Sequence, residues 1–235
     1  MTEIEYVLYI AAIAAIILSI FAQIRVNTVF RRFGGAPTAC RRTAAVVARD
    51  MLDRAGLYDV RIERVGGNLT DHYDPRSRVL RLSDSVYDSS SASAVGVAAH
   101  EAGHALQHAE GYAPLKLRTA MVPVTSFASR FAWLVIFLGI FMMSFADGIA
   151  GYYVSLVGIG LFSLTTLFQL ITLPCEFNAS SRAMAALSGS GCYNTDELAA
   201  SRQVLSAAAL TYVASFALSL LQLLRLLLRV SNRRR

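Results

Sequence analysis

The first apolar run of the chain, residues 6–24, contains no charged residue. At a helical rise of about 1.5 Å per residue it is long enough to cross a hydrocarbon core of about 30 Å. Three later runs, residues 131–146, 149–173 and 207–224, are uncharged in the same way. Charged residues make up only 16% of the chain, against about a quarter in soluble domains. The sequence therefore predicts a mainly α, multi-pass membrane protein.

The charges that flank these runs predict their orientation. Two glutamates precede the first run, and Arg25, Arg31 and Arg32 follow it, which is typical of a retained anchor rather than a cleaved signal peptide. Because arginines concentrate on the cytoplasmic side of spans, the N-terminus is predicted to lie outside. The second and third runs are joined only by Asp147-Gly148, so they form a tight hairpin with its open ends in the cytoplasm.

The last apolar run, residues 207–224, allows two interpretations. It ends in Arg225, Arg229 and three arginines at residues 233–235. If this run crosses the membrane, those arginines lie outside, against the usual tendency. Alternatively, the run lies in the membrane interface with Arg225 and Arg229, four residues apart, on one face. The sequence leaves both open.

Residues 37–112 have the character of a soluble domain. Helical spacing over residues 43–55 ends at Gly56, and three short extended stretches follow at residues 60–65, 69–73 and 78–82. Turn signals separate the stretches, so we expect a small antiparallel sheet of hairpins. Serines at residues 89–91 are suited to cap a helix over residues 92–110.

The predicted organisation has five parts. These are an N-terminal membrane anchor (1–26), a cytoplasmic catalytic region (27–126), a transmembrane hairpin (127–174), a helix region carrying a glutamate ligand (175–206), and a C-terminal apolar helix with a basic tail (207–235).

Charge and cysteine content exclude several classes of protein. The net charge is +6, but no basic run is interleaved with aromatic residues, so a nucleic-acid partner is not expected. The arginines flank apolar runs, where they are suited to phospholipid headgroups of a bilayer. Cys40, Cys175 and Cys192 are odd in number and lack CxxC spacing. This argues against a disulfide framework or a zinc ribbon and favours a reducing compartment.

The chemistry is concentrated in His100-Glu101-Ala102-Gly103-His104. Residues four apart project from the same face of a helix, so His100 and His104 can bind one zinc ion. Glu101 lies beside the first histidine and can act as a base on water without binding the metal. The motif predicts a catalytic zinc site.

A catalytic zinc ion needs a third protein ligand. His108 is a poor choice, because on a continuous helix it lies about 12 Å along the axis from His100. Glu176 is the better candidate, since it follows Pro174 at the end of an apolar run and starts a second helix. Cys175 could also bind zinc, but two histidines and a carboxylate are better suited to hydrolysis than a thiolate.

Three segments carry a family resemblance: His-Glu-Ala-Gly-His-Ala-Leu-Gln-His (100–108), Leu-Thr-Asp-His-Tyr-Asp-Pro (69–75) and Leu-Pro-Cys-Glu-Phe-Asn-Ala-Ser (173–180). Together they resemble the YugP-type neutral zinc metallopeptidases, from the first anchor to residues 209–214. The resemblance implies a multi-pass bacterial membrane protein with a gluzincin-like site. The chain is more distantly similar to the CAAX-prenyl-protease and HtpX-like peptidases, whose glutamate helix reads Glu-x-x-Ala-Asp. Here Ser180 replaces that aspartate, so a carboxylate that orients a ligand histidine is missing or supplied elsewhere.

His72 and Tyr212 are two further candidates for catalysis. Alternation in residues 70–74 places Asp71 and Tyr73 on one face of a strand and His72 on the other, and an edge strand here could hold a substrate backbone. Tyr212, in the last apolar run, is a candidate for stabilising the oxyanion, as a Tyr or His does in related peptidases. An ordinary hairpin strand and an ordinary membrane tyrosine are the alternatives.

The sequence thus predicts a membrane-bound zinc metallopeptidase of the cell membrane, with its active site on the cytoplasmic side and polypeptides, including membrane proteins, as substrates. One alternative is an intramembrane protease, but the apolar residues 92–99 before the motif are too short to span. Another is a non-catalytic zinc-stabilised scaffold or chaperone, but Glu101 would have no function as a base in such a protein. The substrate and the oligomeric state stay open.

Overall fold

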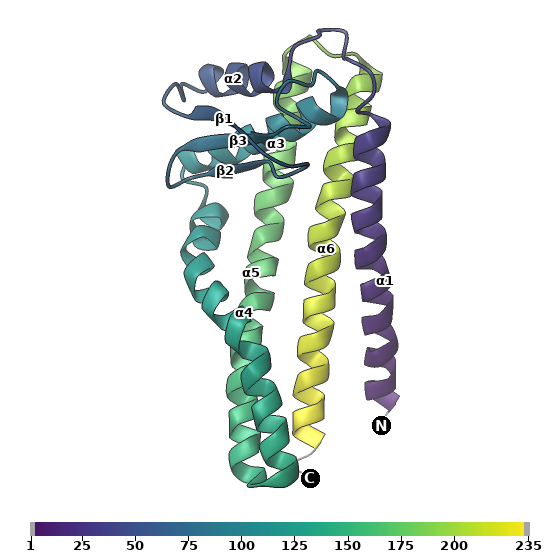
Figure 1. Cartoon of the computed structure of the whole chain (residues 1–235), viewed down its shortest axis with the longest axis vertical. Helices are drawn as coiled ribbons and strands as arrows, with labels where there is room; N and C mark the ends of the chain where they lie inside the picture. The colour runs from purple at the N-terminus through teal and green to yellow at the C-terminus, as the bar shows by residue number, and fades with distance from the viewer. Residues whose placement is uncertain (1–2, 233–235) are drawn as a thin grey trace. The chain divides into compact units, whose positions relative to one another are not determined.

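The computed structural model describes residues 3–232, which fall into two compact units (Figure 1). The helical unit contains the chain up to Phe21, Leu117–Leu173 and the chain from Thr211. The sheet unit contains Ala22–Lys116 and Pro174–Leu210. Four long helices of the described residues contribute to both units, so segments far apart in the sequence come together within each.

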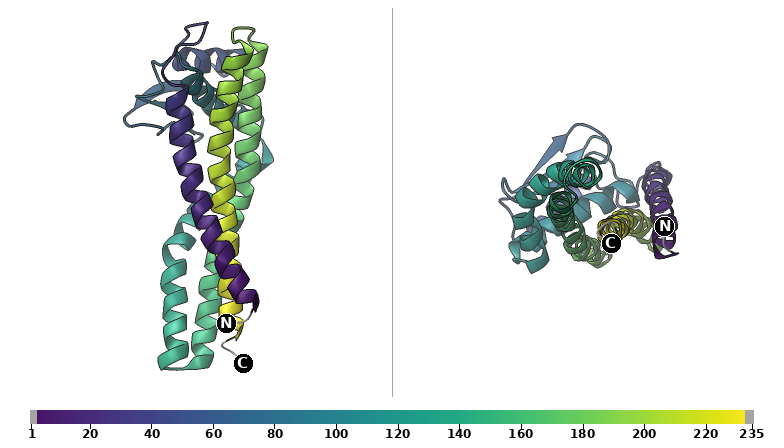
Figure 2. Two further views of the ribbon diagram at one scale, coloured as in Figure 1. Left: turned by 90° about the vertical axis from the view of Figure 1, so that its right-hand side faces the viewer. Right: turned by 90° about the horizontal axis from the view of Figure 1, so that it is seen from below.

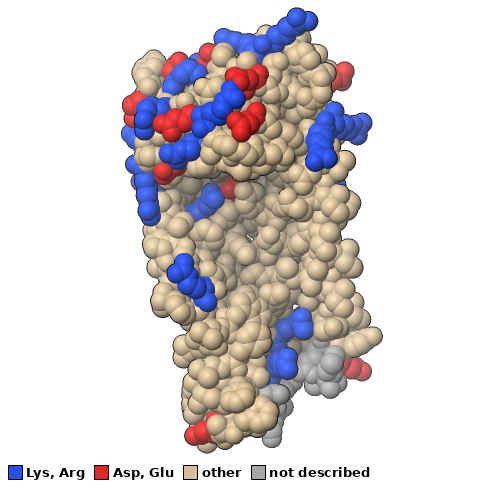
Figure 3. Space-filling model, viewed as in Figure 1, with Lys and Arg blue, Asp and Glu red and all other residues tan. Residues whose placement is uncertain are grey.

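Within residues 3–232, four helices are long and apolar enough to cross a membrane: α1 (Glu3–Arg32), α4 (Ala113–Phe145), α5 (Gly148–Gly189) and α6 (Thr195–Asn232). Large apolar side chains on them remain exposed, among them Leu134, Phe137 and Phe141. Contiguous apolar surface of this kind is unstable in water and is suited to lipid. On the face shown in Figure 3, most of the lower surface is uncharged, with only a few charged side chains. The predicted mainly α, multi-pass membrane fold is confirmed.

Glycines allow α4 and α5 to pack closely as an antiparallel pair (Figures 1 and 2). A Cβ atom at Gly158 would lie 2.7 Å from the backbone nitrogen of Ile136, and Gly139 and Gly151 leave no room for a Cβ either. Small residues at such contacts let two backbones approach each other, which is how membrane helices associate without a hydrophobic driving force. Asp147 caps α5, because its Oδ1 accepts from the amides of residues 149 and 150.

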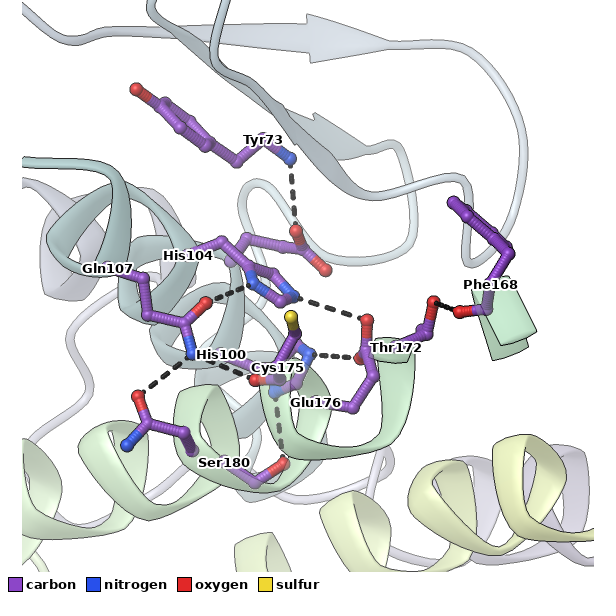
Figure 4. A network of polar contacts seen from close by, with 11 residues as sticks. Tyr73, His100, His104, Gln107, Phe168, Thr172, Cys175, Glu176 and Ser180 are labelled. Atoms are coloured by element: carbon purple, nitrogen blue, oxygen red, sulfur yellow. Dashed lines mark hydrogen bonds and ion pairs between the residues drawn. The ribbon is translucent and has the colours of Figure 1, made fainter. Parts of the chain in front are cut away.

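Helix α5 does not end at Pro174, as the sequence suggested, but continues to Gly189. A proline in a helix interior removes one backbone hydrogen bond, here the one to the carbonyl of Leu170. Two residues earlier, the hydroxyl of Thr172 donates to the carbonyl of Phe168 over 2.8 Å (Figure 4). The continuous helix means that the segment carrying Glu176 is a direct extension of a spanning helix.

Three strands form the sheet: β1 (Arg61–Val65), β2 (His72–Asp74) and β3 (Val79–Ser83), in the order β1-β3-β2. Strand β2 pairs with β3 antiparallel, as predicted, but β1 pairs with β3 parallel, so the expected all-antiparallel sheet is wrong for that pair. The chain does reverse between β1 and β2. It leaves the space of one strand between them, however, and β3 fills that space.

The core of the sheet unit lies between the sheet, α2 (Ala44–Arg54) and α3 (Ala92–Ala109). Both helices begin at caps, since the side chains of Thr43 and Ser91 accept from backbone amides three residues on, and the cap at Ser91 was predicted. Gly111, with φ +68°, follows the end of α3 in a left-handed conformation that favours glycine. The apolar face of α3 is fully buried in this core, which fixes the helix that carries the histidine motif.

Cys40 and Cys192 are joined as a disulfide, with their Cα atoms 5.8 Å apart. The cysteine count argued against a disulfide framework and did not predict this single bridge. The two cysteines are 152 residues apart, and they meet because the loop before α2 lies against the loop before α6. A second contact joins the loop before α2 to the first turn of α6, since the amide of Ala39 donates to Glu197. The third cysteine, Cys175, is buried in α5.

Candidate metal centre

His100 and His104 project from the same face of α3, one turn apart (Figure 4). Their ring centroids are 4.8 Å apart and the rings are nearly perpendicular, at 83°. This is the arrangement expected for residues four apart on a helix. The two imidazoles can therefore reach a common point.

Glu176 completes the group from α5. Its Oε2 lies 3.2 Å from Nε2 of His100, and its Oε1 lies 3.6 Å from Nε2 of His104. One ligand atom from each of the three residues lies within 4.8 Å of the others. Two imidazole nitrogens and a carboxylate are the donor set of a common class of catalytic zinc sites, and they leave a fourth position open. We call these three residues the ligand cluster.

Gly103 allows α3 and α5 to come close enough for this cluster to form. A Cβ atom at Gly103 would lie 2.7 Å from the carbonyl oxygen of Ala179, one turn beyond Glu176. Any larger residue at position 103 would push the two helices apart. The glycine in the motif therefore has a structural role in the approach of the third ligand.

The electrostatics of the ligand cluster favour a cation. Glu176 and His104 are buried, with 3% and 7% of their surface exposed, and an isolated buried carboxylate is costly. Burial lowers the pKa of His104, but the hydrogen bond to Glu176 and the charges of Glu101 and Glu176 outweigh it and raise the pKa above its usual value. A divalent metal would supply the positive charge that this arrangement favours, so the residues fit a zinc ion.

Neutral side chains hold the far nitrogens of both histidines. Nδ1 of His104 lies 2.9 Å from Oε1 of Gln107, and Nδ1 of His100 lies 3.1 Å from the hydroxyl of Ser180 (Figure 4). When Nε2 binds a metal, Nδ1 carries the proton and donates it to these oxygens. Gln107 and Ser180 thus orient the two ligand histidines. The sequence had offered no carboxylate for this role.

The amide of Gln107 is itself fixed. Its Nε2 donates to the carbonyl of Cys175 over 2.8 Å and to Oδ1 of Asn178 over 2.9 Å, which leaves Oε1 to accept from His104. Arg182 donates to the same oxygen of Asn178 and forms a two-pronged ion pair with Glu110 at 2.6 and 2.7 Å. A continuous polar network therefore joins a ligand histidine to an exposed ion pair.

Glu101 lies beside the ligand cluster and is held by the edge of the sheet. Its Oε2 accepts a hydrogen bond of 3.0 Å from the backbone amide of Tyr73 on β2. The hydroxyl of Tyr73 lies 2.9 Å from Nδ1 of His108. Burial raises the pKa of Tyr73. His108 therefore secures β2 against α3 rather than binding the metal.

The remaining candidates lie elsewhere. The ring of His72 is exposed and its Nδ1 lies 2.9 Å from the carbonyl of Thr70, so the neighbouring Tyr73 is the residue of β2 that reaches Glu101. Tyr212 lies on α6 in the helical unit, and its role stays a prediction. Sequence reasoning missed Gln107. Its position three residues after His104 places it on the same face of α3, and that spacing was the available signal.

Comparison with known proteins assigns the chain to a family. A family model described as "Putative neutral zinc metallopeptidase" matches residues 8–231. The chain belongs to this family. The "Putative membrane protease YugP" of Bacillus subtilis (strain 168) is 47% identical over 224 residues, which cover 94% of this chain and 96% of the relative. No solved structure matches the chain.

The family assignment agrees with the geometry on two points. The description names zinc, and the sheet unit brings together a donor set suited to that metal. The relative's name includes a membrane location, and four helices of this chain are suited to span one. The predicted resemblance to the YugP-type peptidases is confirmed.

Proposed function

We propose that this chain is a membrane-bound peptidase that hydrolyses peptide bonds with a zinc ion held by His100, His104 and Glu176. The observation that carries the proposal is the convergence of both Nε2 atoms on one carboxylate, with Glu101 held beside them. Family membership supports zinc as the metal.

Each residue has a distinct task in the proposed reaction. A bound zinc ion supplies a Lewis acid that polarises a peptide carbonyl and lowers the pKa of water to about 7. Glu101 accepts the proton of the attacking water and passes it to the leaving amine. The amide of Tyr73 fixes one oxygen of Glu101 and leaves the other for the water. Gln107 and Ser180 keep both ligand imidazoles in the tautomer that presents Nε2.

The fold favours this proposal over the two alternatives. The motif helix α3 is not among the candidate spans found in residues 3–232, and its apolar face is buried in the core of the sheet unit. That disfavours an intramembrane protease whose motif helix crosses the bilayer. A structural zinc site has no need of a carboxylate oriented by a backbone amide, as Glu101 is, which disfavours a scaffold.

The substrate is proposed to be an extended polypeptide, with membrane proteins among the candidates. Strand β2 is an edge of the sheet, and the backbone of Tyr73 on that edge is directed at Glu101. An added strand here would run past the proposed base. His72 and Tyr212 keep their proposed roles in substrate contact and oxyanion stabilisation. An unchanged kcat in a Tyr212→Phe variant would contradict oxyanion stabilisation by Tyr212.

The sheet unit is proposed to lie on the cytoplasmic side of the cell membrane. Arg31 and Arg32 in the last turn of α1 support this orientation. The disulfide between Cys40 and Cys192 favours the opposite side, because disulfides persist mainly in oxidising compartments. Labelling of intact cells with a membrane-impermeant maleimide, after mild reduction, decides between them: protected cysteines support the cytoplasmic side and labelled cysteines contradict it.

The function is tested by removing and restoring the metal. Detergent-purified protein should contain about one zinc ion per chain and cleave casein or an unfolded membrane protein. A chelator should abolish cleavage, and zinc should restore it, whereas magnesium should not. Cleavage that survives complete removal of zinc would contradict the proposal.

A further inference from the structure

A cavity in the helical unit is lined by residues that the proposed catalysis does not use. Its volume is about 530 Å³, and it lies among α1, α4 and α6. Its polar lining comes from Tyr9, Trp133, Gln222, Arg225 and Arg229, and leucines of α1 and α6 provide the rest. Cavities that bind small ligands are of this size and combine an apolar wall with a few polar groups.

The two arginines give the cavity a positive charge. Arg225 and Arg229 are four residues apart, so they project from one face of α6. None of the ion pairs among the side chains that the structure describes involves either of them. Arginines at the end of an apolar span attract anionic lipid headgroups. The charge of the cavity therefore favours binding of an anion.

The geometry of Arg225 leaves its donors available. Its guanidinium lies over the ring of Tyr9, 5.0 Å from the centroid. This cation–π contact attracts the charge to the ring without a conventional hydrogen bond from the N–H groups. A planar fork of donors matches the oxygens of a phosphate, which arginine binds in a two-pronged manner.

The other lining residues favour a lipid as the source of that phosphate. Tyrosine and tryptophan concentrate at the level of the headgroups, where their rings meet both apolar and polar surroundings. Gln222 offers both a donor and an acceptor to a polar headgroup. The leucines continue the wall as apolar surface that suits acyl chains.

From this combination we infer that the cavity binds an anionic glycerophospholipid, with its phosphodiester between Arg225 and Arg229 and its acyl chains against the leucines. The bound lipid supplies the counter-charge for arginines that follow a spanning helix. This site is separate from the ligand cluster, and the inference does not depend on the proposed peptidase activity.

Trp133 provides a built-in test, because it is the only tryptophan in the chain and it lines the cavity. The full-length protein is reconstituted in phosphatidylcholine bilayers that contain a small fraction of phosphatidylglycerol. Either lipid is supplied with brominated acyl chains, which quench tryptophan fluorescence on contact. We expect brominated phosphatidylglycerol to quench Trp133 far beyond its mole fraction. Equal quenching by the two lipids at equal mole fraction would overturn the inference.

Variants then test the two arginines. The double variant Arg225→Gln/Arg229→Gln should lower the relative affinity for phosphatidylglycerol by about thirtyfold. Arg202→Gln, which removes an exposed arginine from the same helix outside the cavity, should leave it unchanged. An unchanged preference in the double variant would overturn the inference. If that variant fails to fold, Arg225→Lys/Arg229→Lys keeps the charge but loses the fork, and should show a weaker preference than the natural chain.

A last experiment distinguishes a lipid from a free anion as the occupant of the cavity. Inorganic phosphate added at millimolar concentration should not relieve the quenching, because it lacks the acyl chains that contact the leucines. Relief by phosphate alone would show that the cavity recognises a free anion, and would contradict a lipid as its occupant.

Discussion

The helical unit and the sheet unit are held together by different interactions. In the helical unit, glycines such as Gly158 bring backbones into contact, and the buried core is small. In the sheet unit, a large apolar core supports a buried polar network that runs from His104 through Gln107 and Asn178 to Arg182. One unit is suited to remaining in a bilayer, and the other to holding ligands at fixed positions. Variants in the two units should therefore fail in different ways.

The largest effect is expected for Glu176→Gln. The amide keeps the size of the side chain but loses the charge that balances a divalent metal, so zinc should be lost and cleavage abolished. Zinc content and casein cleavage of the purified variant measure this. Glu63→Gln is the matched control, because Glu63 lies on β1 in the same unit in surface ion pairs of low expected energy. Full zinc content in Glu176→Gln would show that Glu176 is not the third ligand.

Removal of the residue that orients His104 should have a smaller effect. In Gln107→Leu, His104 loses its acceptor and the carbonyl of Cys175 loses a donor, so zinc affinity should fall by about 10- to 100-fold. Ser180→Ala should have a smaller effect, because the hydroxyl holds His100 with one longer contact of 3.1 Å. Competition with a zinc chelator gives both affinities. Equal affinities in the natural chain and Gln107→Leu would contradict an orienting role.

Two glycine variants compare the units directly. In Gly103→Ala, the new Cβ would lie 2.7 Å from the carbonyl of Ala179, and the shift of α3 from α5 should cost about 1–3 kcal/mol and weaken zinc binding. Gly158→Ala should cost a similar amount but leave zinc binding intact, because it separates α4 from α5 in the helical unit. Thermal unfolding in detergent and zinc titration measure the two effects.

Gly160→Ala is the control for both glycine variants. A Cβ atom there meets nothing within 4 Å, so the substitution should be neutral or slightly stabilising through helix propensity. Loss of zinc binding in Gly158→Ala would show that the two units do not fail independently.

The smallest effect is expected for Glu110→Gln, at the outer end of the polar network. The hydrogen bonds from Arg182 lower the pKa of Glu110, so its stabilising contribution is present above the usual pKa of a glutamate. It is lost as the pH falls through the lowered pKa. The variant should therefore show a small decrease in Tm at pH 7 that disappears in acid, with zinc affinity unchanged. A decrease in Tm that persists at acidic pH would contradict this cause.

The sequence predicted features that depend on local patterns. Uncharged runs identified the spanning helices, and the spacing of His100 and His104 predicted a shared face of α3. These predictions hold because hydropathy and helical periodicity act over one or two turns. Glu176 was a candidate from its position after an apolar run, and the structure brings it to both histidines.

Features that depend on contacts between distant segments could not be predicted. The parallel pairing of β1 with β3 and the disulfide between Cys40 and Cys192 follow from how separate loops meet. The orienting role of Gln107 depends on Asn178, which lies 71 residues later and fixes the amide. A local pattern gives no information on such pairs.

The central claim is that Glu101 is the base beside a zinc ion. The most direct test measures zinc content and cleavage of Glu101→Gln beside the natural chain, both purified in detergent. The account predicts about one zinc ion per chain in both proteins and a loss of cleavage of about 100- to 10,000-fold or more in the variant, the contribution expected of a general base. Zinc-dependent cleavage at the natural rate in Glu101→Gln would contradict the account.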